Sequence, residues 1–273
     1  MGERLVGAEV RTQSNAAYHG DRSAVSKSML TVFSDSPAEY CRRFVNPTDE
    51  QESKRSKFLT TGSLVDAMLF DTGELKDFVE IPKWALTTNG QRRGKAWDKF
   101  TAMHRGVDFV TESDMELCRR LADRLREVAA SYLSRPGYSQ CSIYWIDPDT
   151  GILCKCRPDK LIVDDKAILF DLKTTVSLER FEWVFRDFLY WLQESHYRAG
   201  VRHLLGCEVE EFVFGVIETA DPHRYREYRI DDNTLAAAND RRRELLADLA
   251  KCKETGNWGN PNVLRPKTIR LFL

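Results

Sequence analysis

Apolar residues recur with two different periods along this chain, and the change of period divides it. Up to about residue 135, wherever a period is visible, apolar side chains return every three or four positions, as on one face of a helix. From Ser139 they form short runs rich in β-branched and aromatic residues, which are typical of strands. The pattern predicts helices over residues 26–44, 60–70, 111–133, 178–205 and 232–253, and strands over residues 139–146, 152–163, 167–174, 212–218 and 224–230.

Three segments lack either period: residues 1–24 are expected to form an arm, 71–111 to be irregular, and 49–57 to form a polar loop. Helices followed by a strand meander, and then by helix and strand, predict a mixed α/β (α+β) fold with a central mixed β-sheet flanked by helices. We expect one domain over residues 1–273, made of a mainly helical part (1–135), a sheet and helix (139–230), and a C-terminal helix and tail (232–273).

Composition narrows the class of protein. Lys and Arg number 41 against 42 Asp and Glu, so any nucleic acid must be held by local patches of charge. Seven cysteines, an odd number, favour reduced thiols in a cytoplasmic compartment, and no apolar run is long enough for a membrane span. Cys154 and Cys156 have no second pair at zinc-site spacing, so we expect small buried side chains. The sequence contains neither a Gly-x-x-x-x-Gly-Lys-Ser/Thr loop nor a Gly-x-Ser-x-Gly elbow, which disfavours P-loop nucleotide hydrolysis and serine acyl transfer.

The candidate chemistry lies in residues 155–174. Two β-rich runs flank the polar triplet Asp164-Asp165-Lys166, which predicts a hairpin with a three-residue loop. Positions whose numbers sum to 330 then lie opposite one another, so Asp159 faces Asp171. Side chains alternate along a strand, so Lys173 shares the face of Asp171.

Two facing carboxylates repel each other unless a cation lies between them. Their hard oxygen ligands suit Mg²⁺ or Mn²⁺, and the ammonium beside them can orient a metal-bound water. The same register places Arg157 opposite Lys173. A two-residue loop would turn Asp159 to the other face, so the interpretation requires the triplet or a compensating bulge. Pro158 has no amide donor, which predicts a distortion or a sheet edge at this point.

These residues resemble a known set of motifs. Pro158-Asp159, then Asp171-Leu172-Lys173, then Gln193 and Tyr197 on a following helix resemble the PD-(D/E)XK nuclease superfamily, which implies a restriction-endonuclease-like core. Within it, the chain resembles the phage RecE-type (exodeoxyribonuclease VIII) branch. The upstream segments that carry this second resemblance are residues 25–30, 36–40 and 61–69, and the matching segments together run from about residue 18 to about residue 218.

The resemblance implies a metal-dependent exodeoxyribonuclease that degrades duplex DNA from an end. Asp159 and Asp171 would hold the metal with the carbonyl of Leu172, and Lys173 would orient the attacking water. Asp66 stands where the branch carries a metal-binding histidine. A carboxylate can also bind Mg²⁺, so Asp66 is either a third ligand or an ordinary helix-surface residue.

Gln193 and Tyr197, four residues apart on one helix face, are implied to place the DNA backbone and the catalytic lysine. For the neighbouring Glu194, His196 and Arg198 a surface position is the default expectation.

The basic cluster Arg92, Arg93 and Lys95 could grip the phosphate of a DNA end, or could be an exposed turn. Arg157 is a further candidate for contact with DNA. The resemblance also implies duplex DNA ends, a single-strand annealing protein and other copies of the chain in a ring as partners, in phage-type recombination.

Two other functions stay open. The replacement of histidine by Asp66 would fit a DNA-binding or assembly protein that has lost turnover, although Asp159, Asp171 and Lys173 are all present. An endonuclease of the same superfamily would use the same residues.

Overall fold

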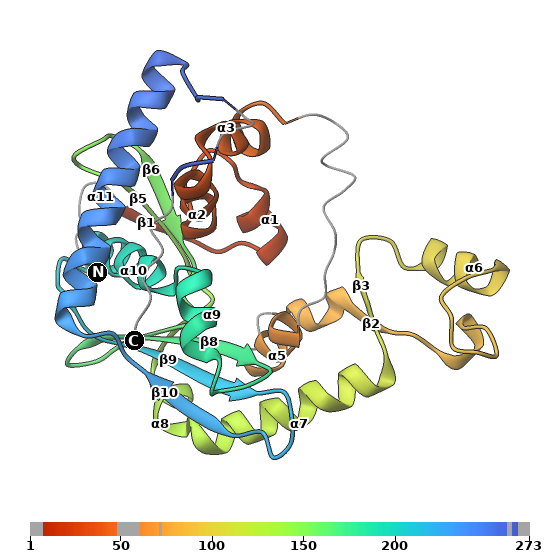
Figure 1. The fold of residues 1–273 in the computed structure, drawn as a ribbon. Helices are drawn as coiled ribbons and strands as arrows, with labels where there is room; N and C mark the ends of the chain where they lie inside the picture. Colours follow the sequence, from red (N-terminus) through yellow and green to blue (C-terminus); the bar gives the residue numbers. More distant parts are fainter. Residues whose placement is uncertain (1–7, 48–60, 71–72, 261–263, 267–273) are drawn as a thin grey trace.

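A computed structural model of the protein describes residues 8–47, 61–70, 73–260 and 264–266. Two sheets form its centre (Figure 1). The larger has the strand order β10-β9-β8-β7-β4, in which β8 and β9 are parallel and the other pairs antiparallel. The smaller, β1-β5-β6, is antiparallel. The strands are β1 (Ala8–Arg11), β4 (Gly137–Ser139), β5 (Ser142–Ile146), β6 (Leu153–Cys156), β7 (Lys160–Val163), β8 (Ala167–Thr175), β9 (Val209–Glu218) and β10 (Tyr225–Tyr228).

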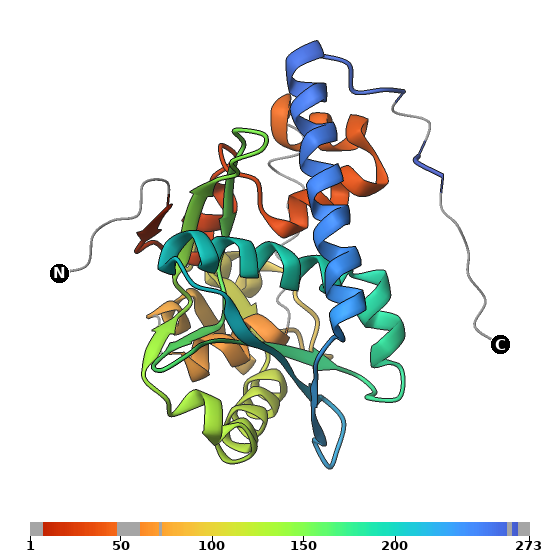
Figure 2. The same ribbon diagram turned by 90° about the vertical axis from the view of Figure 1, so that its left-hand side faces the viewer.

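Helices cover both faces of the larger sheet, because its central strands are apolar on both sides. On one face Leu169 of β8 packs in a cluster with α2 (Lys27–Asp35), α10 (Tyr190–Leu205) and α11 (Asp232–Thr255). On the other face Phe170 packs with α5 (Thr61–Leu69) and α7 (Glu112–Val128). Figure 2 shows α10 above the sheet and α7 below it. The predicted mixed fold with a central sheet flanked by helices is confirmed. None of the described helices is both long and apolar enough to cross a membrane.

The hairpin register predicted from the sum of 330 is confirmed. Lys160 pairs with Phe170, and Val163 pairs with Ala167. The ladder ends at Lys160, however, so the predicted pairings of Asp159 with Asp171 and of Arg157 with Lys173 are wrong as strand pairs.

The chain passes from one sheet to the other twice, between β4 and β5 and again between β6 and β7, and the two crossing points lie next to each other. β4 pairs with β7 in the larger sheet while β5 pairs with β6 in the smaller, so the chain turns a corner twice. Gln140 makes the first turn with a φ of 50°. Pro158 lies in the second, between β6 and β7, and the distortion predicted there is confirmed. The predicted strands 139–146 and 152–163 are therefore wrong as single strands. Cys154 and Cys156 are buried, as expected.

Some predicted helices are divided. Residues 178–205 form α9 (Phe181–Asp187) and α10, separated by Leu189 with a φ of 51°. In residues 26–44, Ser36 ends α2 and caps α3 (Pro37–Tyr40), which continues into a π-helical turn (Cys41–Val45). Residues 111–133 form α7 and α8 (Ala130–Leu133), and the predicted arm contains β1 and α1 (Asn15–Gly20). The polar loop expected at residues 49–57 lies outside the described residues.

Residues 78–110, which we call the α6 lobe, project away from the sheets (Figure 1). The lobe contains the parallel pair β2 (Phe78–Glu80) and β3 (Asp108–Val110), a turn at Lys83–Ala85, and α6 (Lys95–Met103). Phe100 of α6 is buried in a small separate core. Its ring centroid lies 5.8 Å from that of Trp97. The prediction that residues 71–111 are irregular is wrong for this segment, because a local aromatic core stabilises it.

α10 runs through the interior of the protein. It can do so because of Gly200, where a Cβ would lie 2.7 Å from the indole of Trp145. His196 is fully buried, and the buried Glu194 pairs with Arg198 at 2.8 Å. The expected surface positions of Glu194 and His196 are therefore wrong, since this helix has a neighbour on each side.

We predict that His196 makes stability depend on pH. Burial, followed by the positive charge of Arg242, lowers the pKa of His196 to about 3, against 6.5 in the unfolded chain. Between these two values the unfolded state binds a proton that the folded state does not. Stability is therefore lost as pH falls from 6.5 towards 3, by about 1.4 kcal/mol per pH unit.

The matched variant is His196→Gln, which keeps a polar side chain that cannot gain a charge. In urea unfolding at pH 7, 6 and 5, the wild type should lose stability more steeply than the variant. Parallel pH profiles for the two proteins would contradict the assignment.

Candidate active site

A freed strand edge is the geometric origin of the site. Beyond Phe170, β8 continues beside β9, but β7 has already ended at Lys160. The amide of Leu172 would have no strand partner there, and it donates instead to Oδ2 of Asp159 at 2.7 Å. The N–H and C=O of one strand residue point to the same side, so the carbonyl of Leu172 emerges at this edge too.

Gln140, at the turn between β4 and β5, holds Asp159 in place. Its backbone N–H donates to the carbonyl oxygen of Asp159 at 3.0 Å, and its Nε2 donates to Oδ1 at 2.8 Å. Burial, followed by the nearby charge of Asp171, raises the pKa of Asp159 to about 7. Sequence reasoning missed Gln140, because its role depends on a tertiary corner and a left-handed backbone.

Asp171 and Lys173 lie on one face of β8, as predicted, and form an ion pair. Gln193 of α10 donates to Oδ1 of Asp171 at 2.6 Å, so each oxygen of this buried carboxylate has one partner. Burial alone would lower the pKa of Lys173, but the attraction of Asp171, Tyr190 and Asp159 together outweighs it and the pKa is raised. The Lys173 ammonium also lies 4.9 Å from the ring centroid of Tyr190.

Asp66 of α5 lies in the same cavity. Its Oδ1 is buried and has no hydrogen-bond partner among the described residues. Burial, followed by the charge of Asp159, raises the pKa of Asp66 well above its usual value. An orphaned buried carboxylate oxygen is costly unless a proton or a cation accompanies it.

These side chains fit a hard divalent cation by their chemistry, because the donors are oxygens and one is unsatisfied. No three His, Cys, Asp or Glu side chains among the described residues form a ready-made metal cluster, however. The carboxylates already have partners within the protein: the Lys173 ammonium donates to Asp171, and the Leu172 amide donates to Asp159. A metal at this site would therefore have to compete with Lys173 for Asp171.

The cavity that these residues line has a volume of about 300 Å³. Its walls come from α1, α2, α5, β8 and α10, which are far apart in the sequence. Tyr197 lines it beside Gln193, as predicted from their spacing. Lys27 at the start of α2 is a second lysine in the cavity, and burial, followed by the charge of Lys173, lowers its pKa to about 7. The apolar spacing of α2 gives no signal for this role.

The structure does not bring all predicted site residues together. Arg92, Arg93 and Lys95 lie on the α6 lobe and do not line the cavity. Arg157 does line it, but only 7% of this residue is exposed. Its guanidinium donates to the carbonyl of Gln13 and to the side chains of Gln140, Ser142 and Glu74. Little of Arg157 is left for DNA, and it holds the corner between the sheets.

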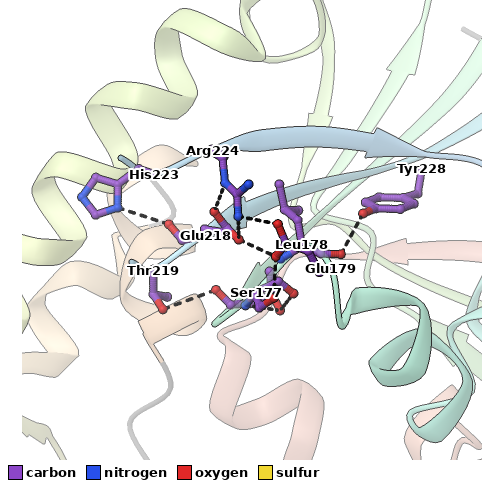
Figure 3. Close-up of polar contacts among 9 residues, drawn as sticks. Ser177, Leu178, Glu179, Glu218, Thr219, His223, Arg224 and Tyr228 are labelled. Atoms are coloured by element: carbon purple, nitrogen blue, oxygen red, sulfur yellow. Dashed lines mark hydrogen bonds and ion pairs between the residues drawn. The ribbon is translucent and has the colours of Figure 1, made fainter. Parts of the chain in front are cut away.

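A polar network fixes the end of β8 just beyond Lys173 (Figure 3). Glu218 of β9 accepts the Leu178 amide at 2.8 Å and pairs with Arg224 at 2.6 Å. Thr219 donates its amide to the carbonyl of Thr175 at 2.8 Å. The turn after the candidate catalytic strand is thus tied to β9 and β10.

A mixed sheet with two carboxylates and a lysine around one freed strand edge defines the PD-(D/E)XK class of proteins. Residues 26–262 match the family described as a PDDEXK-like domain of unknown function (DUF3799), and the chain belongs to this family. No curated protein sequence matches the chain.

Two solved structures are similar in fold. A candidate exonuclease from Eubacterium rectale superimposes with a TM-score of 0.60 and 16% identity, over 94% of this chain and 96% of its own. At this identity the match shows the fold alone. The protein SSO0001 gives a TM-score of 0.36 and 13% identity over 83% of this chain and 77% of its own, which is too low to carry an argument.

We predict that Arg157→Gln acts on stability rather than on DNA. The change leaves Glu74 without its ion-pair partner, in a pair whose side chains are 5% and 17% exposed. Loss of one member of a buried pair destabilises by about 3 kcal/mol. Denaturant unfolding and a DNA-binding titration on the folded variant measure the two effects. A stable variant with weakened DNA binding would instead make Arg157 a DNA contact.

Proposed function

We propose that the protein is a metal-dependent exodeoxyribonuclease of the RecE-like branch, which degrades duplex DNA from an end. One observation carries the proposal: a single buried cavity collects Asp66, Asp159, Asp171 and Lys173 around a strand edge that lacks a neighbour. The similarity in fold to a candidate exonuclease supports the same class of activity.

Each residue has a distinct part. Asp159 and Asp171, with the carbonyl of Leu172 and with Asp66, would hold Mg²⁺ or Mn²⁺. When bound, the ion lowers the pKa of its water and stabilises negative charge on the phosphate. Lys173 orients the attacking water. Gln193 holds Asp171 in place, and its hydrogen bond of 2.6 Å keeps the carboxylate aimed into the cavity.

The lysines of the cavity suit the negative charge of the substrate. Lys173 and Lys27 are the two lysines among its described lining residues, and Lys27, with its pKa lowered to about 7, carries its charge in only part of the molecules at neutral pH. Tyr197 lines the cavity with Gln193 and would contact the DNA backbone. Association with a single-strand annealing protein, and assembly of several copies into a ring, are further parts of the proposal.

The rival function is a DNA-binding protein without turnover. It is favoured by the internal partners of Asp159 and Asp171, which a metal has to displace or share. Linear and closed circular duplex DNA, incubated with the protein and Mg²⁺ or Mn²⁺, separate the possibilities. Loss of the linear form alone supports the exonuclease. Loss of both forms indicates an endonuclease, and loss of neither supports the binding protein.

We predict that Lys173→Ala lowers the cleavage rate at least about 100-fold, as expected when a group that acts on the water is removed. DNA binding should remain near that of the wild type. The control is Lys166→Ala, in the exposed hairpin at the other end of β8, where Lys166 pairs only with Glu210 among the described residues. Near-normal cleavage by a folded Lys173→Ala protein would refute the assigned chemistry.

We also predict that Asp66 contributes to metal binding. Asp66→Asn keeps the shape of the side chain but removes a buried ionisable group whose charged form repels Asp159. The metal-free variant should be at least as stable as the wild type, while its melting temperature should rise less on addition of Mg²⁺ or Mn²⁺. Asp66→His should retain cleavage, with preference shifted towards Mn²⁺. Equal metal-induced shifts in wild type and Asp66→Asn, with equal cleavage rates, would show that Asp66 has no part in the site.

A further inference from the structure

The α6 lobe differs in charge from the rest of the protein. Its residues 78–110 contain six Lys and Arg against three Asp and Glu, a formal charge of +3. The remainder of the chain has 35 basic and 39 acidic residues, a formal charge of −4. A positive unit is thus attached to a negative body.

The cations of the lobe are available for a partner. Lys83 lies 3.7 Å from Glu112 at the start of α7. The five others are exposed, and none of their side chains has an ion pair or hydrogen bond to a described residue. These five are Arg92, Arg93, Lys95, Lys99 and Arg105. Of the three acids, Glu80 and Asp108 lie in the strands at the base, which leaves only Asp98 on α6.

The lobe is held apart from the cavity by its own structure. Phe100 packs with Trp97, Trp84 and Phe109 inside the lobe, whereas Val110 at its base packs in the core around α5. No lobe residue appears among the described residues that line the cavity. The chain enters the lobe from the segment after α5, which carries Asp66, so the two surfaces are neighbours along the molecule (Figure 1).

We propose that the α6 lobe grips the phosphate backbone of duplex DNA outside the cavity, at positions interior to the end that the cavity receives. Duplex DNA carries one negative charge per about 1.7 Å of its axis, so a projecting group of unpaired cations is complementary to it in any sequence. The inference rests on the proposed function in taking duplex DNA as the substrate. It replaces the expectation that Arg92, Arg93 and Lys95 hold the terminal phosphate.

A protein partner is the alternative occupant, since Trp84 and Met103 are exposed on the lobe by 54% and 63%. The unpaired cations favour DNA, because five of them outnumber the single acid Asp98 on the projecting part. An acidic surface of a second copy of this chain would also attract them, and the experiment must separate that case.

The test measures binding without turnover, in EDTA, on linear duplex labelled at one end. The lobe variant is Lys95→Gln/Lys99→Gln. The matched control is Lys251→Gln/Lys253→Gln, which removes two equally exposed lysines from α11 on the other side of the molecule. Melting temperatures establish that all three proteins are folded.

For the lobe variant, the slope of log affinity against log salt should become shallower by about 1.8, since each lost phosphate contact changes it by about 0.9. The control should keep the slope of the wild type. Chemical footprinting should show that the lobe variant loses protection in the duplex interior but keeps it at the end.

Three results would overturn the inference. The first is an unchanged slope in the lobe variant. The second is an equal change in the α11 control, which would indicate only general charge. The third is a changed oligomeric state with DNA binding intact, which would make the lobe a subunit contact.

The proposed function is judged separately, by wild-type cleavage of linear DNA. If the wild type cleaves linear DNA but the lobe variant binds DNA as the wild type does, the proposed function stands and this inference fails. If the lobe variant binds DNA more weakly but the wild type does not cleave, the inference stands and the proposed function fails.

Discussion

The structure depends on one hydrogen bond that takes the place of a missing strand. β7 stops beside Phe170, yet β8 continues towards Lys173, and the exposed amide of Leu172 is satisfied by the carboxylate of Asp159. A buried amide without a partner would cost about 1–3 kcal/mol, so this contact stabilises the open edge. It also draws the carboxylate to within reach of Asp171. The bond that completes the sheet and the arrangement that forms the site are therefore the same interaction.

The electrostatics of the cavity follow from the balance between three acids and the lysines around them. Lys173 neutralises Asp171 directly, whereas Asp159 is held by neutral donors from Leu172 and Gln140. Asp66 has a buried oxygen that receives no hydrogen bond from any residue in the described part of the chain. Burial, followed by the charges of the neighbouring acids, raises the pKa of both Asp159 and Asp66. Without a cation the cavity favours protons, and a divalent ion would exchange for them.

The hairpin could be predicted from sequence because its determinants are local. The triplet at residues 164–166 set the loop, alternation set the faces, and the pairing of Lys160 with Phe170 followed. Pro158 indicated a distortion, but not that the chain would pass there from one sheet into another. That corner is decided by the pairing of β4 with β7 and of β5 with β6, which no local pattern encodes. Gln140 and Lys27 were missed because they reach the cavity through such tertiary pairings. The break at Leu189 was missed because helical spacing continues on both sides of it.

The parallel pairing of β2 with β3 has a consequence for how the chain is assembled. Glu80 and Val110 are register partners, so the chain leaves the lobe beside the place where it entered. Because the two strands run in the same direction, the chain has to cross back from the end of β2 to the start of β3, and the lobe forms that crossover. The segment between them has its own aromatic core, and the cavity takes no residue from it among those described. In architectural terms the lobe is an insertion between α5 and α7, so a change in its charge should leave the geometry of the candidate active site unaltered.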